Sequence, residues 1–196
     1  RIKGNAATLY AVYTDELRRQ LLAQKQLENR FDQALAGREF LVFYQPKFNL
    51  AHRRFAGAEA LVRWRDETGR LLPPGEFVPV FERNGDIVRL DQYVLDTVCQ
   101  DIRRWLNEGR RVVPVSVNVS RLQLLNAGFV ETYLRIINEH QVPLHLIQLE
   151  FTESLMVENE QVLISVAEAL HRAGVMVLMD DFGSGYSSLN MLKCVP

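Results

Sequence analysis

The sequence predicts an α/β fold of the TIM (β/α)8-barrel type, of which the chain covers about five strands, preceded by a linker helix. Apolar strands alternate with amphipathic helices along the second half of the chain, as in a parallel sheet. In addition, four strands carry an acidic or amide side chain at their carboxyl ends, where barrels have their active sites. An open doubly wound sheet usually gathers its site on one or two strands, so four contributing strands favour a barrel.

Composition and charge limit the classes of function. The chain has 196 residues, 47% hydrophobic and 24% charged, which is typical of a globular protein. Its formal net charge of −1 gives no bulk attraction to polymeric nucleic acid or anionic lipid. No apolar run approaches the roughly 20 residues that span a bilayer. Cys99 and Cys194 have no CxxC spacing, and we expect free thiols in a reducing cytoplasm.

The chain begins with a short mixed segment, residues 1–13, which we interpret as the tail of an upstream domain. From Thr14 to Ala36 the sequence lacks Gly and Pro, and its apolar residues recur mostly in four-residue steps, which predicts a helix. Thr14 is the expected N-cap and Gly37 the stop. The helix either packs on the following domain or acts as a connector or dimer-forming element; the sequence leaves both open.

Two strands follow this helix, over residues 39–50 and 52–64, and a hairpin through Asn49–Arg53 would connect them. Pro46 limits the pairing of the first strand. Helices are expected over Gly75–Arg83 and Leu90–Glu108, the second on the helical spacing of its apolar residues.

Three repeats of one strand–helix pattern complete the chain. Strands are expected within residues 112–120, 144–153 and 175–182, and helices over roughly 126–139 and 159–173. Because these strands are apolar with little alternation, we expect parallel strands covered on both faces. A complete barrel typically needs about 250 residues, so we expect this chain to be part of a longer one.

The polar residues at the strand ends are Glu59, Asn118, Glu150 and the pair Asp180-Asp181. Each occupies the same place in its own strand–helix unit. A carboxylate at the end of a buried strand is costly unless a cation receives it. Mg²⁺ and Mn²⁺ prefer such oxygen ligands, and two ions a few ångströms apart suit the hydrolysis of a phosphodiester.

Other residues extend this site. Arg63 follows Glu59 at an even offset, which places both on one face of a strand, where the guanidinium could reach a phosphate oxygen. Gly183 and Gly185 allow the segment after Asp181 to approach a ligand closely. Glu153 is interpreted as a support of the loop after Asp181 rather than as a ligand.

Each of these residues also has an ordinary structural explanation. Glu59 alone could be a salt-bridge partner, Asn118 could hold a loop, and an Asp-Asp pair is common in surface turns. The repeated position in successive units favours a shared site, although no single residue establishes it.

Six motifs in order, FYQP, GAEALVRW, PPGEFVPVFE, VSVNVS, LEFTES and DDFGSGYSSL, resemble the EAL domain family over residues 39–196. The resemblance implies a modified TIM barrel that hydrolyses the bacterial second messenger cyclic di-GMP to linear pGpG. It implies two ions, Mg²⁺ or Mn²⁺, the first held by Glu59, Asn118, Glu150 and Asp180 and the second by Asp181.

The resemblance also assigns roles around the metals. It places Glu59, Asp181 and Glu153 in the catalytic machinery, and Gln45, Leu61 and Arg63 against the substrate. The chain departs from the usual motifs at Phe151 and at Lys47-Phe48, and we expect neither departure to touch a predicted ligand. A lysine, a further glutamate and a glutamine of the family's site would follow Pro196.

The segment GNAATLYAVYTDELRRQ resembles the exit from a GGDEF domain. It implies a GGDEF-EAL tandem protein in which residues 1–13 end the upstream domain, 14–36 form the linker helix and 37–196 begin the EAL domain. We expect a cytoplasmic domain of an inner-membrane-anchored or sensory protein, and a homodimer. Two alternatives remain: a catalytically inactive receptor of cyclic di-GMP, and a module that signals by dimerisation.

Overall fold

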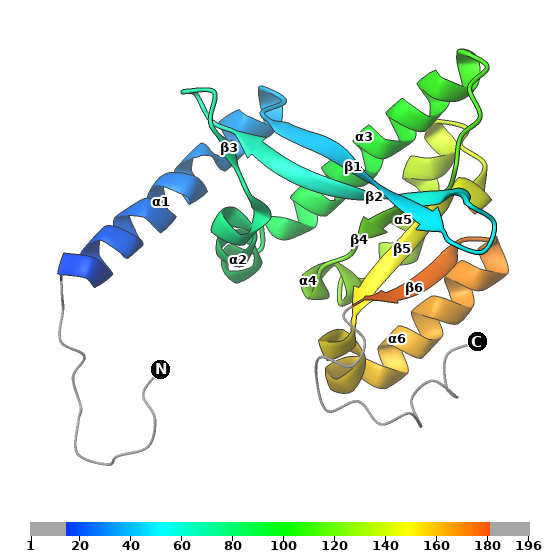
Figure 1. Ribbon diagram of the computed structural model, residues 1–196. Coiled ribbons are helices and arrows are strands. Elements are labelled where there is room, and N and C mark those ends of the chain that lie inside the picture. Colours follow the sequence, from blue (N-terminus) through cyan, green and yellow to red (C-terminus); the bar gives the residue numbers. More distant parts are fainter. Residues whose placement is uncertain (1–14, 181–196) are drawn as a thin grey trace.

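The computed structural model describes residues 15–180, except for the side chains of residues 153–160. Its centre is a six-stranded sheet in the order β1-β2-β4-β5-β6, with β3 paired to β2 (Figure 1). The strands are β1 (Phe40–Asn49), β2 (Arg54–Arg65), β3 (Leu71–Leu72), β4 (Val115–Asn118), β5 (Ile147–Thr152) and β6 (Met176–Asp180). The pairs β2–β4, β4–β5 and β5–β6 are parallel, which confirms the predicted α/β class. The expected hairpin is present, since β1 pairs with β2 in antiparallel fashion.

Helices alternate with the strands as the sequence predicted. They are α1 (Asp15–Ala36), α2 (Pro74–Asn84), α3 (Ile87–Asn107), α4 (Arg121–Leu124), α5 (Phe129–Glu139) and α6 (Glu153–Ala173), with a 3₁₀ turn at Leu144–Leu146. Helix α6 begins six residues before its expected start at Asn159, immediately after β5. The single turn α4 was not predicted; the Ser120 side chain caps it by accepting a hydrogen bond from the Gln123 amide.

The two faces of the sheet differ in chemistry. Apolar side chains that alternate along the strands pack against the helices and are buried, among them Ala60, Trp64, Val115, Val117, Ile147, Leu149 and Phe151. The intervening positions on the opposite face are largely polar, and include Gln45, Lys47, Glu59, Ser116, Asn118, Glu150 and Asp180. The sequence led us to expect parallel strands covered on both faces; among the described residues the helices pack on the apolar face, and Ser116 and Glu150 on the polar face are also buried.

The C-terminal half of α1 belongs to the core of the domain. Phe31 is 1% exposed, and its ring centroid lies 4.8 Å from Phe81 and 5.9 Å from Phe40. Glu39, just after the helix, accepts hydrogen bonds from Arg30 at 3.1 Å and from the Trp64 indole at 2.9 Å. The interpretation that this helix packs on the following domain is therefore confirmed for its C-terminal half.

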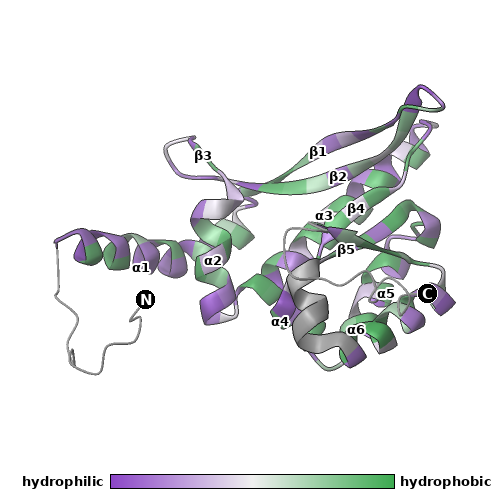
Figure 2. Cartoon of the chain, turned by 60° about the horizontal axis from the view of Figure 1, so that its bottom comes forward, coloured by the Kyte–Doolittle hydropathy of each residue, from purple (hydrophilic) through white to green (hydrophobic). Residues whose placement is uncertain are grey.

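The N-terminal half of α1 extends away from the sheet, and hydrophilic residues alternate with hydrophobic ones along it (Figures 1 and 2). Leu21 and Leu22 are 48% and 56% exposed, so the apolar stripe predicted along the whole helix is buried only near its end. The helix ends at Ala36, as expected from Gly37, whereas Thr14 lies outside the described residues.

The predictions about the cysteines and about membrane-spanning segments can be compared with the described residues. Cys99 is a buried free thiol, in agreement with the prediction, and burial raises its pKa to about 12; Cys194 lies outside the described residues. Between residues 15 and 180, no helix is both long and apolar enough to cross a membrane.

Candidate metal centre

Glu59 lies in the middle of β2, not at its end. It is opposite Gln45 on β1 and Ser116 on β4. The prediction of a strand-end position was wrong because the antiparallel pairing with β1 extends β2 to Arg65, beyond the short parallel segment that pairs with β4. Glu59 nevertheless faces the polar side of the sheet.

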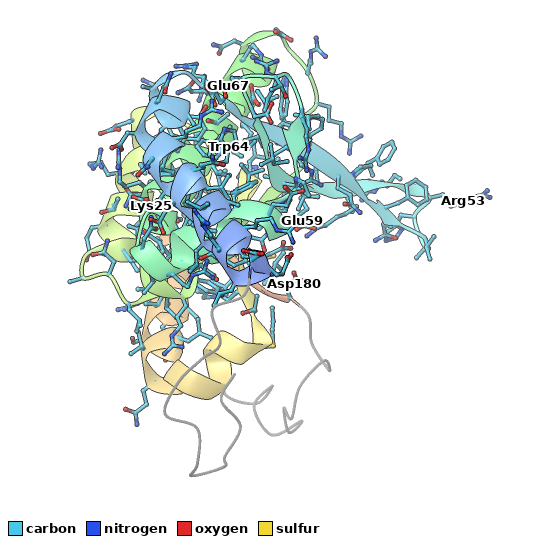
Figure 3. The ribbon with its side chains drawn as sticks, turned by 90° about the vertical axis from the view of Figure 1, so that its left-hand side faces the viewer. Lys25, Arg53, Glu59, Trp64, Glu67 and Asp180 are labelled. Carbon is cyan, nitrogen blue, oxygen red and sulfur yellow. The ribbon has the colours of Figure 1, made fainter. Side chains whose placement is uncertain are left out.

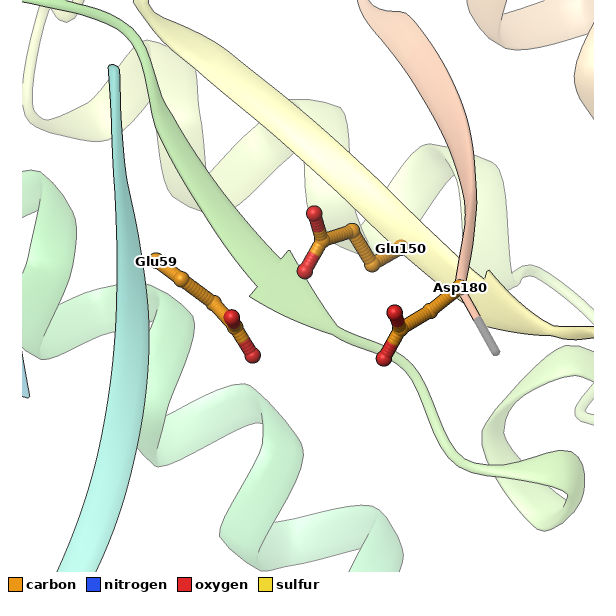
Figure 4. Close-up of side chains that lie close together, drawn as sticks. All are labelled: Glu59, Glu150 and Asp180. Atoms are coloured by element: carbon orange, nitrogen blue, oxygen red, sulfur yellow. The ribbon is translucent and has the colours of Figure 1, made fainter. Parts of the chain in front are cut away.

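The next three strands supply the other predicted ligands at one edge of the polar face. Asn118 is the last residue of β4 and is opposite Glu150 on β5, while Asp180 is the last residue of β6. Carboxylate oxygens of Glu59, Glu150 and Asp180 all lie within 4.8 Å of one another. Figure 4 shows the three side chains converging from β2, β5 and β6 on one point.

Glu150 is the buried member of this group. Its side chain is 7% exposed, and its Oε2 atom has no hydrogen-bond partner. An ionised oxygen that is buried without a partner costs free energy, whereas coordination of a cation would satisfy it. The donor set, three carboxylates and a nearby amide, is the all-oxygen set that Mg²⁺ and Mn²⁺ prefer. The residues present therefore fit a divalent ion.

Asn118 is tied directly to this cluster. Its Nδ2 atom donates a hydrogen bond to Glu59 Oε1 at 3.0 Å. The structure thus brings all four predicted ligands of the first ion to one place.

Lys47 also belongs to the site, and the sequence argument missed it. Its ammonium forms an ion pair with Glu150 Oε1 and donates a hydrogen bond to Ser116 Oγ at 2.8 Å. The expectation that the departure at Lys47 touches no predicted ligand is wrong. The available signal was its even offset from Gln45, which places Lys47 on the same face of β1.

The three predicted substrate contacts lie beside the cluster on the same face. Gln45 is exposed and opposite Glu59, while Leu61 and Arg63 follow Glu59 along β2. Arg63 is partly buried and donates to the carbonyl of Val62 at 2.9 Å. At about 3.3 Å per residue, Arg63 begins about 13 Å along the strand from Glu59. It therefore borders the centre instead of joining it.

Asp181, Gly183 and Gly185 lie outside the described residues. The backbone of Glu153 begins α6, but its side chain is also outside the described set.

A buried polar group behind β4 supports the loop that follows Asn118. Asp91 on α3 is 8% exposed and accepts a hydrogen bond from the Ser120 backbone amide at 3.0 Å. Burial raises the pKa of Asp91 to about 7, against the lowering effect of the Ser120 hydrogen bonds; nearby Glu82 raises it further. No sequence signal identified Asp91, because an aspartate in an amphipathic helix ordinarily faces solvent.

The candidate centre and the hairpin tip lie apart. Figure 3 shows Glu59 and Asp180 close together, with Arg53 at the far end of the β1–β2 hairpin. The tip carries exposed Phe48 and Phe55, whose ring centroids are 5.6 Å apart.

Comparisons with known proteins agree with this architecture. A profile of the EAL domain family matches residues 28–196. The chain is 40% identical over 177 residues to the bifunctional diguanylate cyclase/cyclic di-GMP phosphodiesterase MucR of Pseudomonas aeruginosa. That alignment covers 89% of this chain but 26% of MucR, so the chain spans about a quarter of this relative's length.

Solved structures show the same similarity in three dimensions. The PaMucR phosphodiesterase in complex with c-di-GMP matches with a TM-score of 0.82 and 37% identity, over 87% of this chain and 69% of that one. The EAL enzyme Bd1971, with cAMP and cyclic-di-GMP bound, matches with a TM-score of 0.79 and 29% identity, over 92% of this chain and 52% of that one. The motifs, the partial barrel and the family match together establish that this chain belongs to the EAL domain family.

Proposed function

We propose that the protein containing this chain hydrolyses cyclic di-GMP to linear pGpG in a reaction that depends on Mg²⁺ or Mn²⁺. The observation that carries the proposal is the convergence of Glu59, Glu150 and Asp180, with an oxygen of buried Glu150 left without a partner. The similarity to a phosphodiesterase solved with c-di-GMP supports the choice of substrate.

In this proposal, Glu59, Asn118, Glu150 and Asp180 hold the first ion, and Asp181 contributes to the second. Divalent ions bound there would acidify water and balance charge on the phosphate oxygens. The chain itself fixes the ligands on neighbouring strands, so little conformational freedom is lost when an ion binds. Glu153 is proposed to brace the segment after Asp181.

The substrate is proposed to lie along the polar face beside the ions. Arg63 would donate hydrogen bonds to a phosphate oxygen, an interaction for which its planar guanidinium is suited. Gln45 and Leu61 border the same strip of β1 and β2 and would contact the nucleotide.

The setting of the domain is also a proposal. We infer that residues 1–13 end an upstream sensory or GGDEF domain and that 14–36 are the linker helix before the EAL portion, 37–196. The full protein is expected to act as a homodimer, with this domain in the cytoplasm. The long exposed half of α1 supports a connecting role.

One observation favours a second function, binding of cyclic di-GMP without hydrolysis. In the Lys47–Glu150 ion pair, the lysine side chain neutralises Glu150, the buried carboxylate proposed as a metal ligand. In a receptor, such a pair would stabilise the site without an ion.

One experiment on the full-length protein distinguishes hydrolysis of cyclic di-GMP from binding without hydrolysis. Purified protein is incubated with cyclic di-GMP and either Mg²⁺ or Mn²⁺, and pGpG is followed by chromatography while binding is measured by calorimetry. Glu59→Gln should reduce turnover by at least a hundredfold, because it removes a ligand charge. Glu67→Gln, at a side chain 75% exposed, is the matched control and should retain activity. If the wild type binds cyclic di-GMP but forms no pGpG, the proposed hydrolysis is rejected and the receptor function is supported.

A further inference from the structure

The side chain of Lys47 follows a path that the sheet leaves open for it. Lys47 is opposite Gly57 in the β1–β2 register. A Cβ atom built on Gly57 would lie 3.9 Å from Lys47 Cδ and 4.0 Å from Lys47 Cβ. The aliphatic stem therefore passes over the one position of β2 that has no side chain, on its way toward β4 and β5.

Two buried partners hold the ammonium at the end of this path. Ser116 is fully buried, and its hydroxyl donates to the Ala58 carbonyl at 3.3 Å while it accepts from Lys47. The second partner is Glu150 Oε1. Exposed ion pairs contribute little, but here the carboxylate is 7% exposed and largely removed from water.

The Glu150 carboxylate lies between Lys47 and the proposed position of the divalent ion. Its Oε1 atom pairs with Lys47 and its Oε2 atom has no hydrogen-bond partner, while one of its two oxygens lies within 4.8 Å of carboxylate oxygens of Glu59 and Asp180. A divalent ion held by these three carboxylates would therefore sit within a few ångströms of a fixed positive charge. Like charges at that distance repel appreciably even where water screens them.

We propose that Lys47 is a resident counter-cation of Glu150 that competes with the divalent ion and so sets the metal affinity of the centre. This inference rests on the proposed metal centre. In the metal-free protein, Lys47 keeps buried Glu150 neutralised and oriented. Binding of an ion must weaken the Lys47–Glu150 pair. The centre therefore fills at a higher ion concentration than it would with the three carboxylates and no lysine.

Calorimetric titration of the full-length protein with Mn²⁺ tests this assignment directly. Lys47→Met removes the charge and keeps much of the stem, and should bind Mn²⁺ at least fivefold more tightly than the wild type. Lys47→Arg keeps the charge and should stay within twofold of the wild type. Lys25→Met, the same substitution on exposed α1, controls for the change in net charge and should also stay within twofold.

Thermal unfolding gives a readout that is independent of turnover. In EDTA, Lys47→Met should unfold at a lower temperature than the wild type, because Glu150 then lacks its counter-charge. At the same excess of Mn²⁺, its Tm should rise by more than that of the wild type, since at a given concentration a ligand that binds the folded protein more tightly stabilises it more. Lys47→Gln is the second neutral variant, and should show the same two changes if Lys47→Met does not fold in EDTA.

The outcomes distinguish this inference from the metal centre on which it rests. If both neutral variants bind Mn²⁺ more weakly than the wild type, or within twofold of it, the proposal that Lys47 competes with the ion is overturned, while the metal centre stands. A wild-type protein that binds no Mn²⁺ would overturn both.

Discussion

Asn118 at the end of β4 donates a hydrogen bond from Nδ2 to Glu59 Oε1 on β2 at 3.0 Å. The bond links two predicted ligands across neighbouring strands and fixes the orientation of the amide. With Nδ2 directed to Glu59, the oxygen Oδ1 is the Asn118 atom that would bind a cation. The contact makes the arrangement of the centre sensitive to the charge at position 118.

Asn118→Asp should destabilise the metal-free protein and be rescued by metal. The new carboxylate would face Glu59 without a donor, so repulsion adds to the lost hydrogen bond at a cost of roughly 1–2 kcal/mol. Thermal unfolding in EDTA and in Mn²⁺ measures this, with Asn29→Asp on the exposed side of α1 as the control. A Tm for Asn118→Asp equal to that of the wild type in EDTA would contradict the predicted repulsion.

Asp91→Asn should flatten the dependence of stability on pH. The ordinary pKa of an aspartate carboxyl is 3.8, and burial raises the pKa of Asp91 to about 7 in the folded protein. Between these values the folded protein holds a proton that the unfolded chain releases, so stability falls as pH rises. From about pH 5 to about pH 8, the wild type should lose roughly 2 kcal/mol more than Asp91→Asn.

Urea unfolding at the two pH values measures this difference. Asp15→Asn, at an exposed position on α1, should keep the slope of the wild type. Parallel slopes for the wild type and Asp91→Asn would show that Asp91 does not titrate in this range.

Phe31→Ala should lower the free energy of unfolding by about 3–5 kcal/mol, because its ring is buried among Phe40 and Phe81. Leu22→Ala, nine residues earlier on the same helix and 56% exposed, should change it by less than about 0.5 kcal/mol. Equilibrium urea unfolding provides the comparison. Similar small effects at both positions would mean that α1 does not contribute to the core of the domain.

Gly57→Ala should destabilise the sheet by about 1–2 kcal/mol, since the added Cβ would lie 3.1 Å from the Pro114 carbonyl oxygen. That oxygen accepts the Ala58 amide at 2.9 Å, so it cannot easily move away. Gly75→Ala is the matched control: nothing lies within 4 Å of its added Cβ, and the change should be neutral or slightly stabilising. Equal stabilities of the two variants, measured by urea unfolding, would contradict this close approach of β2 and β4.

The alternation of strands and helices could be read from the sequence because periodicity is a local property. The apolar runs that became β4, β5 and β6 and the helical spacing of α3 indicated the α/β class and placed these four elements to within a few residues. The single turn α4 had no such signal, and α6 begins six residues before its expected start. The acidic residues of the site were identified in the same way, since a carboxylate within an apolar strand is conspicuous in any sequence.

Contacts between distant strands, by contrast, depend on register and pairing. The antiparallel pairing of β1 with β2 places Glu59 inside a long strand, and it sets Lys47 opposite Gly57, from where the Lys47 side chain reaches Glu150. Burial of Asp91 against the Ser120 amide likewise needs α3 to pack behind β4. The sequence alone determined which acidic and amide side chains could form a site and on which strands they lie. Only the tertiary structure decided which charges meet, because an ion pair depends on the positions of atoms from separate strands, whereas an apolar pattern depends on one strand.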